Sequence, residues 1–513
     1  MIVSKQVTFP NSFLTESPIR THLIMADADA HPVWRGVVLV LFWILTIKSH
    51  SKLPPGPLAL PIVGNLPFIN KYAPYKSVQE FSKTHGPVMT IYLGRTRAVF
   101  LVGYDAVKEA IVDRGEDFSG RAPIHFFNKA TKGYGLAISN GERWKQIRRF
   151  TLTTLRDFGM GRKTMEAWIQ EESQHLIARI ESFKGNPFDP FVFNQTVSNV
   201  ICCLVFGERF VYEDKQLLRI VQFFSEFIQF NSTVFGQLYN IFPWLLDHLP
   251  GRHHDMFAKV EEMKKFNMKK IEEHMKTLDS SSPRDFIDCF LLRMNQEKDD
   301  PNSEFHIDNL WTTVLNLFAA GTETTSSTIR FTLTVFMKYP EIQKRMQEEI
   351  DSVIGRERSP NMEDRKSLPF TDAVIHEVQR FLDLVPMGVP RYALKDITFR
   401  GYTIPKGTYI FAMLTSVLKE DKHWATPLMF NPQHFLDHNS NFKKNQFFMP
   451  FAAGKRACVG ESLARMELFI FLVTLLQHFT FSCSEGGDSI DLTPEFSSFG
   501  NMPRRYDVVA TPQ

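Results

Sequence analysis

One cysteine and its neighbours limit what this chain can build. Cys458 lies in the run Phe-Ala-Ala-Gly-Lys-Arg-Ala-Cys-Val-Gly at 451–460, directly before a helical pattern that starts at Glu461. Glycine adopts positive φ and lets the backbone approach a flat ligand closely. The dipole and the unpaired N–H groups of a helix N-terminus hold a cysteine there as the thiolate. Such a thiolate can be the axial ligand of a haem iron, so the spacing F-x-x-G-x-R-x-C-x-G favours a haem site over the usual role of a lone cysteine as inert core.

Apolar residues repeat with a helical period over most of the chain. Two short apolar runs, 88–93 and 98–102, flank Gly94-Arg95-Thr96-Arg97 and predict a hairpin. Further strand-like runs occur at 397–411 and near the C-terminus. We therefore expect a mainly α fold with small β-sheets, in one large body without repeats or a second linker. The predicted helices cover 142–156, 164–183, 191–206, 216–230, 255–278, 306–338, 340–354, 371–382 and 461–478.

Composition and missing motifs exclude several classes of protein. Lys+Arg 59 against Asp+Glu 56 gives a net charge of +3, which is too balanced for a chain that coats nucleic acid. Apolar residues at 43% exclude a mainly disordered chain. The 5 cysteines form no CxxC pair, which indicates a reducing compartment. The HExxH-like run at 376–380 ends in arginine and so lacks a zinc ligand, and no GxSxG, GxGxxG or Walker P-loop occurs.

The N-terminal part carries the apolar run VWRGVVLVLFWILTI at 33–47. It is shorter than the roughly 20 residues that span a bilayer, although Arg35 near its start can snorkel to the headgroups. Lys48 and Lys52 follow it, which favours a cytosolic location for the rest of the chain. We expect an uncleaved anchor; a cleaved signal peptide and an interfacial or core segment are the alternatives, and Met25 is an alternative start. The expected order is a leader at 1–32, a membrane anchor helix at 33–48, a Pro-rich linker at 49–65 and a catalytic domain at 66–513.

The long helix expected at 306–338 contains a stretch of poor helix formers. Its apolar part runs into Gly321-Thr322-Glu323-Thr324-Thr325. Thr324 can donate a hydrogen bond to the carbonyl of Ala320, which would open the helix locally into a polar notch. A kink caused by packing alone is the alternative. The functional interpretation is an acid–alcohol pair, in which Thr324 steadies dioxygen and Glu323 connects protons to it.

These motifs together resemble those of the cytochrome P450 superfamily, in the same order along residues 54–513. The run at 451–460 resembles the haem-binding loop of that superfamily, and the stretch around Thr324 resembles the A-G-x-[D/E]-T-T motif of helix I. Residues 144–148 resemble the W-x-x-x-R of helix C, and 54–57 match the Pro-Pro-Gly-Pro element. The resemblance implies the cytochrome P450 fold and a single large haem-thiolate monooxygenase domain behind the anchor.

The resemblance also implies how a haem would be held. Cys458 would be the proximal ligand of haem b (iron protoporphyrin IX). Trp144, Arg148, Arg391 and Arg456 would contact the haem propionates, because arginine suits a carboxylate; each arginine taken alone is more often a solvated charge. The loop residues that shape the cofactor site would be Phe451, Gly454 and Gly460.

Two further matches concern structure rather than chemistry. Glu377 and Arg380 match the E-x-x-R of helix K, and their position on an apolar stripe predicts a buried ion pair. The alternative is a surface pair worth about 0.2–0.5 kcal/mol. Residues 430–435 resemble the P-x-x-F segment, with His434 where many members have arginine. His434 can still donate a hydrogen bond to the pair.

Within the superfamily the chain is similar to the microsomal family-2 members, nearest to the subfamily J fatty-acid epoxygenases, on the runs 146–153 and 240–244. An apolar pocket with few polar anchors accepts unsaturated fatty acids such as arachidonic acid, and xenobiotics equally well. The substrate-pocket residues implied by the resemblance are Phe227, Leu317, Ala320, Val385 and Phe499.

The resemblance therefore implies a haem-thiolate monooxygenase of the endoplasmic reticulum membrane, with its catalytic domain facing the cytosol. It would insert one oxygen atom from O2 into an apolar substrate. Electrons would come from NADPH through NADPH–cytochrome P450 reductase, and cytochrome b5 is a further candidate partner. The alternatives are a peroxide isomerase or dehydratase of the same superfamily and a non-catalytic haem- or lipid-binding protein. The Glu323–Thr324 pair argues against both, because neither needs protons delivered to dioxygen.

Overall fold

The helices expected from apolar periodicity all form, and their ends lie within three residues of the predicted ones. A computed structural model describes residues 52–158 and 163–513. Apolar stripes account for the positions of these helices, and in α9 (Lys215–Ser232) a polar cap adds to this, because Asp214 accepts hydrogen bonds from the backbone N–H groups of Gln216 and Leu217. The predicted helices are α6 (Gly141–Asp157), α7 (Lys163–Glu181), α8 (Val192–Phe206), α9 (Lys215–Ser232), α12 (Arg252–Thr277), α14 (Ile307–Lys338), α15 (Pro340–Val353), α16 (Pro369–Leu382) and α18 (Glu461–His478).

Shorter helices fill the connections, and the sequence predicted none of those named here. They cover one to three turns, too few for a hydrophobic period to stand out. They are α3 (Pro74–His85), α4 (Tyr104–Lys108), α5 (His125–Thr131), α10 (Val234–Ile241), α11 (Pro243–Leu246), α13 (Phe286–Gln296) and α17 (Leu414–Leu418). A π-helical turn, η2 (Glu109–Asp113), continues α4, and a 3₁₀ turn, η5 (Gly454–Arg456), precedes Cys458.

The sheets are small, as expected. The predicted hairpin forms from β1 (Val88–Leu93) and β2 (Thr96–Leu101), with Val88 opposite Leu101. It is extended by β6 (Tyr409–Ala412), parallel to β2, and by β3 (Arg391–Tyr392), in the order β1-β2-β6-β3. Three two-stranded sheets pair β4 (Ile397–Phe399) with β5 (Tyr402–Ile404), β7 (Phe479–Ser482) with β10 (Val509–Pro512), and β8 (Phe496–Ser497) with β9 (Asn501–Met502).

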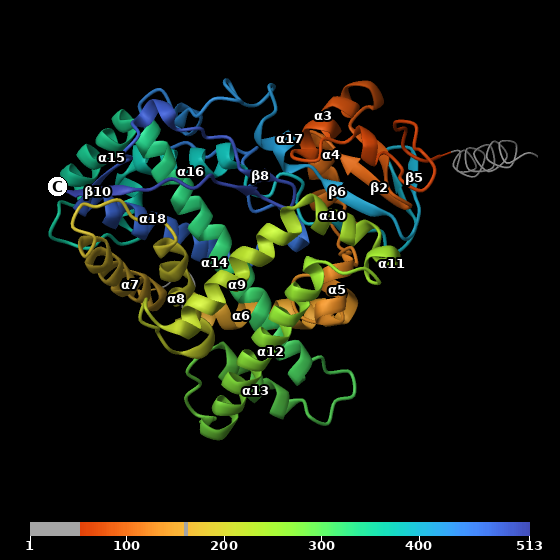
Figure 1. Cartoon of the computed structure of the whole chain (residues 1–513), viewed down its shortest axis with the longest axis horizontal. Coiled ribbons are helices and arrows are strands. Elements are labelled where there is room, and N and C mark those ends of the chain that lie inside the picture. Colours follow the sequence, from red (N-terminus) through yellow and green to blue (C-terminus); the bar gives the residue numbers. More distant parts are fainter. Residues whose placement is uncertain (1–51, 159–162) are drawn as a thin grey trace, which may run out of the picture. The chain divides into compact units, whose positions relative to one another are not determined.

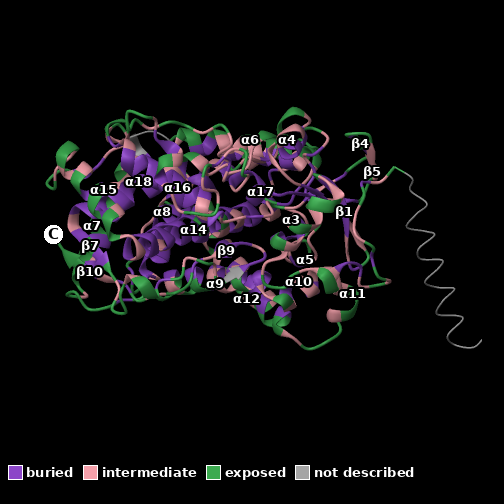
Figure 2. Ribbon diagram, turned by 90° about the horizontal axis from the view of Figure 1, so that it is seen from above, coloured by how far each residue is buried: buried purple, intermediate pink, exposed green. Residues whose placement is uncertain are grey.

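The helix α14 runs through the middle of the helical part (Figure 1). It packs against α8, α9, α16 and α18, and the buried residues concentrate along these helices (Figure 2). Gly321 explains how α8 comes so near, since a Cβ at this position would lie 2.5 Å from Cδ1 of Ile201. The glycine in the middle of α14 therefore permits close helix packing at a cost of about 1 kcal/mol in helix propensity.

The described part of the expected Pro-rich linker lies against the first sheet. The backbone N–H of Thr90 donates to the Pro55 carbonyl at 2.8 Å, and the Thr90 hydroxyl donates to the Pro54 carbonyl at 2.9 Å. Gly56 is needed at this contact, because a Cβ there would lie 1.8 Å from the Thr90 carbonyl oxygen. Proline lacks an N–H but keeps its acceptor, so the run docks on β1 through its carbonyl groups.

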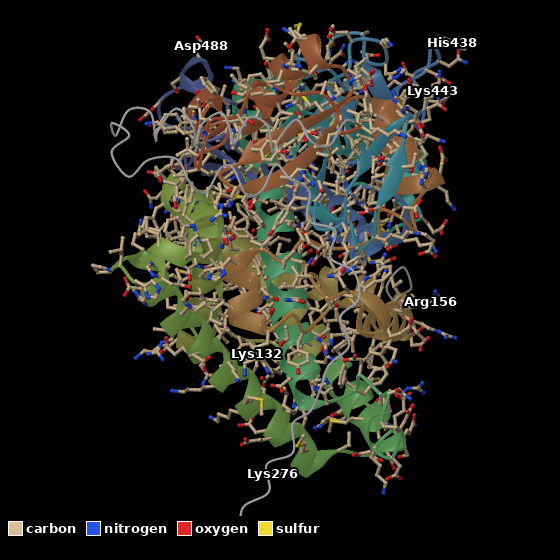
Figure 3. All side chains as sticks on the ribbon, turned by 90° about the vertical axis from the view of Figure 1, so that its right-hand side faces the viewer. Lys132, Arg156, Lys276, His438, Lys443 and Asp488 are labelled. Carbon is tan, nitrogen blue, oxygen red and sulfur yellow. The ribbon has the colours of Figure 1, made fainter. Side chains whose placement is uncertain are left out.

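Charged side chains stand on the outside of the body. The labelled Lys132, Arg156, Lys443 and Asp488 all project away from the ribbon (Figure 3). None of the helices within 52–158 and 163–513 has the length and apolar character to cross a bilayer. The anchor predicted at 33–48 lies outside the described residues.

Candidate haem site

Cys458 lies in a tight loop directly before α18, as the sequence predicts. Its backbone N–H donates to the Phe451 carbonyl at 3.1 Å, which closes the loop. Gly454 has a φ of 73°, and a Cβ at this position would lie 1.7 Å from the carbonyl oxygen of Ile111 in η2. Gly460 is the N-cap residue of α18. The glycine spacing therefore serves both backbone conformation and the close approach of η2 to this loop.

Two opposing influences act on the thiol of Cys458. Desolvation raises its pKa, and the N–H groups of Gly460 and Glu461 and the Arg148 charge oppose this shift without reversing it. The N-terminus of α18 thus favours the thiolate, as expected for a cysteine at this position, and desolvation acts against it. The side chain is nevertheless exposed. A coordinating metal cation removes the proton from a thiol outright, so the group remains a competent metal ligand.

Four arginines and one tryptophan gather beside the Cys458 loop. Arg456 stacks on the Trp144 ring, with its Cζ 3.8 Å from the ring centroid, and Arg148 donates to the Ala457 carbonyl at 2.7 Å. Arg391 donates to the Phe118 carbonyl and Arg121 to the Val389 carbonyl. Trp144, Arg391 and Arg456 are buried and Arg148 is half-buried. The structure thus brings the four predicted propionate contacts together with Arg121, a weaker candidate for the same role in the sequence.

This arginine cluster lacks a counter-charge among the described residues. The cluster forms no ion pair with an acidic side chain in 52–158 and 163–513; its four arginines are Arg121, Arg148, Arg391 and Arg456. Desolvation lowers the pKa of Arg391 to about 10 and, with repulsion from the neighbouring arginines, that of Arg456 to about 9. The buried Nε1 of Trp144 also has no hydrogen-bond partner within that part of the chain. An anionic group with several oxygen acceptors fits this surface, and the two carboxylates of a haem meet that requirement.

The middle of α14 presents Ala320 and Thr324 to open space. They are the exposed residues of this 32-residue helix, which is otherwise buried or half-buried. The Thr324 hydroxyl donates to the Ala320 carbonyl at 2.6 Å, as predicted. The predicted opening of the helix does not occur, because α14 remains helical from Ile307 to Lys338. The hydroxyl adds to the backbone hydrogen bonds rather than replacing one.

Glu323 lies on another side of α14 from Thr324 and is buried. Its carboxylate accepts hydrogen bonds from Asn194 of α8 at 2.8 Å, from Arg330 at 3.0 Å and from Ser327 at 3.3 Å. Desolvation raises the pKa of this carboxyl, and the nearby Arg330 charge opposes the shift. The carboxyl therefore binds a proton more readily than an exposed glutamate does. It faces α8, however, and not the side of α14 that carries Thr324.

The predicted buried pair of helix α16 forms. Arg380 contacts Glu377 through two N–H···O bonds of 2.7 Å, and both side chains are fully buried. Nδ1 of His434 lies 3.1 Å from Glu377 Oε2, and the backbone N–H of Thr426 donates to His434 Nε2 at 3.2 Å. Because Nε2 accepts, the ring proton is assigned to Nδ1, and His434 is a neutral donor to Glu377. The histidine thus supplies the hydrogen bond expected of it.

The predicted pocket residues come from four segments, and one residue that was not singled out joins two of them. Phe127 of α5 packs against Phe227 of α9, with ring centroids 5.2 Å apart, and stacks on Phe499 at 5.8 Å. Leu317 lies one turn from Ala320 on α14. The fourth segment, which carries Val385, follows α16 and is tied to the β8–β9 hairpin by a hydrogen bond from the Asn501 N–H to the Leu384 carbonyl. Phe127 lies in the segment 121–136, which the resemblance also places at the pocket. Sequence spacing gave no signal for Asn501, because its partners are 117 to 119 positions away.

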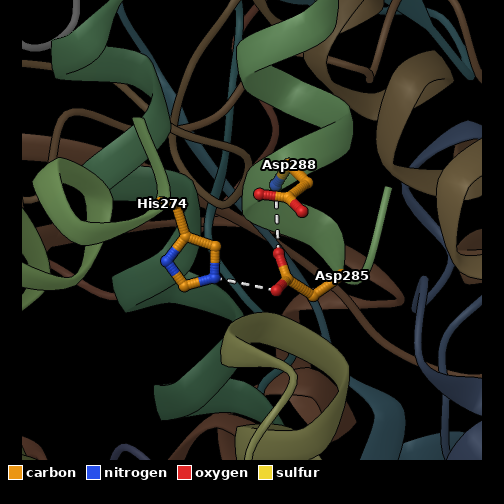
Figure 4. A group of neighbouring side chains, drawn as sticks. All are labelled: His274, Asp285 and Asp288. Carbon is orange, nitrogen blue, oxygen red and sulfur yellow. Dashed lines mark hydrogen bonds and ion pairs between the residues drawn. The ribbon is translucent and has the colours of Figure 1, made fainter. Parts of the chain in front are cut away.

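A second cluster of ionisable side chains lies between α12 and α13 (Figure 4). His274 Nε2 is 2.8 Å from Asp285 Oδ2, and His274 Nδ1 is 2.7 Å from the Lys270 carbonyl oxygen. Asp285 also caps α13 by accepting from the Asp288 N–H, while Arg284 binds the Asp288 carboxylate. Since both imidazole nitrogens face acceptors, this group joins two helices as an ion pair and does not offer free metal ligands.

Comparison with known proteins identifies the family. The cytochrome P450 family model matches residues 54–510. Cytochrome P450 2F2 of Rattus norvegicus is 49% identical over 475 residues, which cover 92% of this chain and 97% of the relative. Cytochrome P450 2C3 of Oryctolagus cuniculus is 48% identical over 93% of this chain and 97% of the relative, and cytochrome P450 2A4 of Mus musculus is 50% identical over 90% and 93%. The chain therefore belongs to the cytochrome P450 family, next to its family-2 members, and is a haem-thiolate monooxygenase of that family.

Proposed function

We propose that this chain oxidises unsaturated fatty acids, with arachidonic acid as the test substrate, using a haem b ligated by Cys458. The single observation that carries the site is a set of buried arginines that have no counter-charge in 52–158 and 163–513 and lie beside an exposed cysteine at the start of α18. Such a surface requires an anion with a flat apolar body, and haem b combines both. When bound, the haem supplies the iron at which dioxygen is activated.

The residues of the chain then have distinct tasks. Cys458 provides the thiolate, and Arg148, Arg391 and Arg456 bind the propionates with the Trp144 N–H. Phe451, Gly454 and Gly460 shape the loop so that the cofactor can approach the backbone.

Thr324 and Glu323 of α14 have different roles in proton transfer. The Thr324 hydroxyl gives its hydrogen to the Ala320 carbonyl, so its oxygen is free to accept a hydrogen bond from a proton donor. Desolvation raises the pKa of the buried Glu323 carboxyl, which Asn194 and Arg330 keep in place, so this group takes up a proton more readily than an exposed glutamate. Because the two side chains leave α14 on different sides, a proton moves between them only through an intervening carrier.

Fatty-acid epoxidation is the finer part of the proposal. It rests on the resemblance of 146–153 and 240–244 to the subfamily J epoxygenases and on the aromatic wall formed by Phe127, Phe227 and Phe499. An apolar wall of this kind binds a lipid chain by burial and offers few polar anchors. Leu317, Ala320 and Val385 would complete the pocket.

The cellular setting belongs to the same proposal. The segment 33–48 would anchor the chain in the endoplasmic reticulum membrane, with residues 66–513 as the catalytic domain on the cytosolic side. Electrons would come from NADPH–cytochrome P450 reductase, and cytochrome b5 would be a second donor. The exposed Lys145, Arg149 and Lys455 are the basic residues proposed to meet an acidic partner, although Lys145 already pairs with Glu142 and Lys455 with Glu116.

The ligand is tested by substitution of Cys458. Cys458→Ser should abolish the red-shifted Soret band of the reduced carbon monoxide complex, because that band depends on a thiolate ligand. Cys483→Ser is the matched control, since Cys483 is a half-buried free cysteine outside the site, and it should keep the band. Survival of the band in Cys458→Ser would show that another residue ligates the iron.

The activity is tested in a reconstituted assay with reductase, NADPH and arachidonic acid, with products resolved by mass spectrometry. Epoxides or hydroxy acids that require NADPH support the monooxygenase and the lipid substrate. Consumption of NADPH without an oxygenated lipid contradicts the epoxygenase part alone. Turnover of a fatty-acid hydroperoxide without NADPH contradicts the proposal and favours the isomerase or dehydratase alternative.

A further inference from the structure

The tip of the β8–β9 hairpin is bound to the end of α16 by one buried side chain. Asn501 is 1% exposed, and its Nδ2 donates to the carbonyls of Leu382 at 3.0 Å and Asp383 at 2.7 Å. Its backbone N–H donates to the Leu384 carbonyl at 2.8 Å. Three successive carbonyl groups at the end of a helix are thus satisfied by a residue that is 117 or more positions away in the chain.

The same hairpin tip contacts two other segments of the predicted pocket. The Ser498 hydroxyl donates to the Ser232 carbonyl at the end of α9, at 2.6 Å. Phe499 stacks on Phe127 of α5. Gly500 lies so near the α16 end that a Cβ there would be 3.1 Å from the Leu384 carbonyl oxygen. Residues 498–501 therefore join three segments that are far apart in sequence.

We propose that Asn501 is a positioning residue that sets the specificity of the pocket, by fixing the segment 384–388 against the hairpin tip that carries Phe499. This inference rests on the proposed function, because it names a determinant of the same site. Asn501 touches the backbone of both pocket segments rather than the substrate. It acts through Val385 on one side and Phe499 on the other.

The chemistry of the contact requires an amide. Asparagine offers two N–H donors on one nitrogen, and both are used here on carbonyl oxygens. An aspartate of the same shape would present lone pairs to those carbonyls. It would also add a second carboxylate next to Asp383, whose own oxygens lack hydrogen-bond partners among the described residues. Asn501→Asp therefore breaks the contact while keeping the volume of the side chain.

A small shift of these segments has a large effect on selectivity. Misplacement of a reacting group by about 1 Å can cost about 100-fold in rate. If 384–388 moves away from the hairpin tip, the distance between Val385 and Phe499 changes, and a different part of a flexible chain comes to rest nearest the reacting centre. Such a shift changes which ligands are preferred and which position along a ligand lies nearest the reacting centre. It does not change the capacity to bind haem.

The experiment compares Asn501→Asp with Asn65→Asp in the full chain loaded with haem. Asn65 is an equally buried amide that donates to the Pro57 and Leu58 carbonyls, far from the pocket in sequence and in the sheet region. The probes are 1-alkylimidazoles of increasing chain length, whose binding shifts the Soret band without turnover. The second readout is hydrogen exchange of the peptide 382–388.

We expect Asn501→Asp to change the ratio of Kd for long and short alkylimidazoles by about fivefold, the equivalent of one ordinary hydrogen bond. Exchange at 382–388 should become faster, and Asn65→Asp should change neither readout. An unchanged ratio in Asn501→Asp, or an equal change in Asn65→Asp, overturns the inference. If Asn501→Asp does not load haem, Asn501→Ser, which keeps one donor, should show the same change to a smaller extent.

Failure of this inference is separable from failure of the proposed function. Alkylimidazole binding requires the haem but neither arachidonic acid nor reductase, so it tests Asn501 even if another compound is the substrate. If the wild-type chain binds alkylimidazoles but leaves arachidonic acid unchanged, the substrate proposal fails. If the wild-type and Asn501→Asp profiles coincide while epoxides are formed normally, only the role of Asn501 fails.

Discussion

Asp383 is a buried carboxyl at the end of α16, in a conformation that few residue types adopt easily. Its φ is 50°, and aspartate and asparagine tolerate this left-handed region better than other side chains with a Cβ. The side chain is 1% exposed, and Lys419 Nζ lies 3.5 Å from it. Desolvation outweighs the lysine and raises the pKa of Asp383 from 3.8 to about 6. The residue therefore weakens the fold at neutral pH.

The pH dependence of stability follows from this shift. The folded protein keeps the proton of Asp383 up to pH about 6, whereas the unfolded chain loses it near 3.8, so the stabilisation is complete below the lower value and is lost as pH rises through the higher one. Asp383→Asn removes this loss. Its free energy of unfolding should gain about 2 kcal/mol on the wild type between pH 4 and pH 7, the larger part of the roughly 3 kcal/mol that the whole shift is worth. Urea unfolding at both pH values checks it, and a difference that is independent of pH would contradict the assignment.

Residues differ in how far their surroundings could be predicted. The Glu377–Arg380 pair could be predicted, because both partners lie on one turn of one apolar helix. The partners of Glu323 could not, because Asn194 reaches it from a helix 129 positions earlier. His253, in the first turn of α12, is fully buried and stacked on Tyr239 of α10. No local pattern signals a contact that only the packing of two helices creates.

At the scale of elements, the loop before α18 depends on its contact with η2. Gly454 and Gly486 are both exposed, and both have a positive φ, which is 73° for Gly454 and 83° for Gly486. They differ in space, since a Cβ at Gly454 would lie 1.7 Å from the Ile111 carbonyl oxygen and a Cβ at Gly486 would meet nothing within 4 Å. Gly486→Ala should therefore cost only the backbone strain, about 1–2 kcal/mol.

Gly454→Ala should cost the same strain and about 1–3 kcal/mol more, because the loop and η2 must separate. Haem content per polypeptide should fall with it, since the displaced loop carries Cys458. Unfolding free energies and the absorbance ratio of haem to protein measure both effects. Equal costs for the two alanine variants would mean that η2 does not constrain the loop.

Elements were predictable where the apolar period runs over several turns. The long helices lie where the period puts them, and the hairpin at β1 and β2 follows from its alternating runs and its turn. The helices α10 and α11 were missed because 8 and 4 residues are too short for a period to appear. The run at 54–57 looked like a free linker, because nothing in a proline-rich sequence shows that its carbonyls accept hydrogen bonds from β1.

At the scale of the whole molecule, the fold gathers like charges at the proposed haem site. Arg121 is 9% exposed, and its pKa is lowered by desolvation and by repulsion from Arg391, Arg456 and Arg148. The cluster costs stability in the protein alone and returns it when an anion is bound. Binding sites commonly carry such a trade-off between stability and function.

Arg121→Gln should therefore act in opposite directions on two forms of the protein. The haem-free form should gain about 1 kcal/mol, because one repelling charge is removed. The haem-loaded form should release haem about tenfold faster, because one positive charge beside the proposed propionate contacts is lost. Denaturant unfolding of the haem-free form and haem transfer to an acceptor protein measure these effects. Arg209→Gln is the control, since Arg209 pairs with the buried Glu172 at 2.6 Å and its loss should destabilise both forms.

Solvent exchange of one His434 proton measures how often the folded body opens. The Nδ1 proton of His434 lies against a fully buried carboxylate, the other ring nitrogen is occupied by the Thr426 N–H, and the side chain is 4% exposed. Such a proton exchanges with solvent only when α16 and the segment after α17 part. In heavy water the magnetic resonance signal of this proton should decay at the rate at which α16 and the segment after α17 separate. One imidazole hydrogen would thus report the lifetime of the closed body, without any label added to the chain.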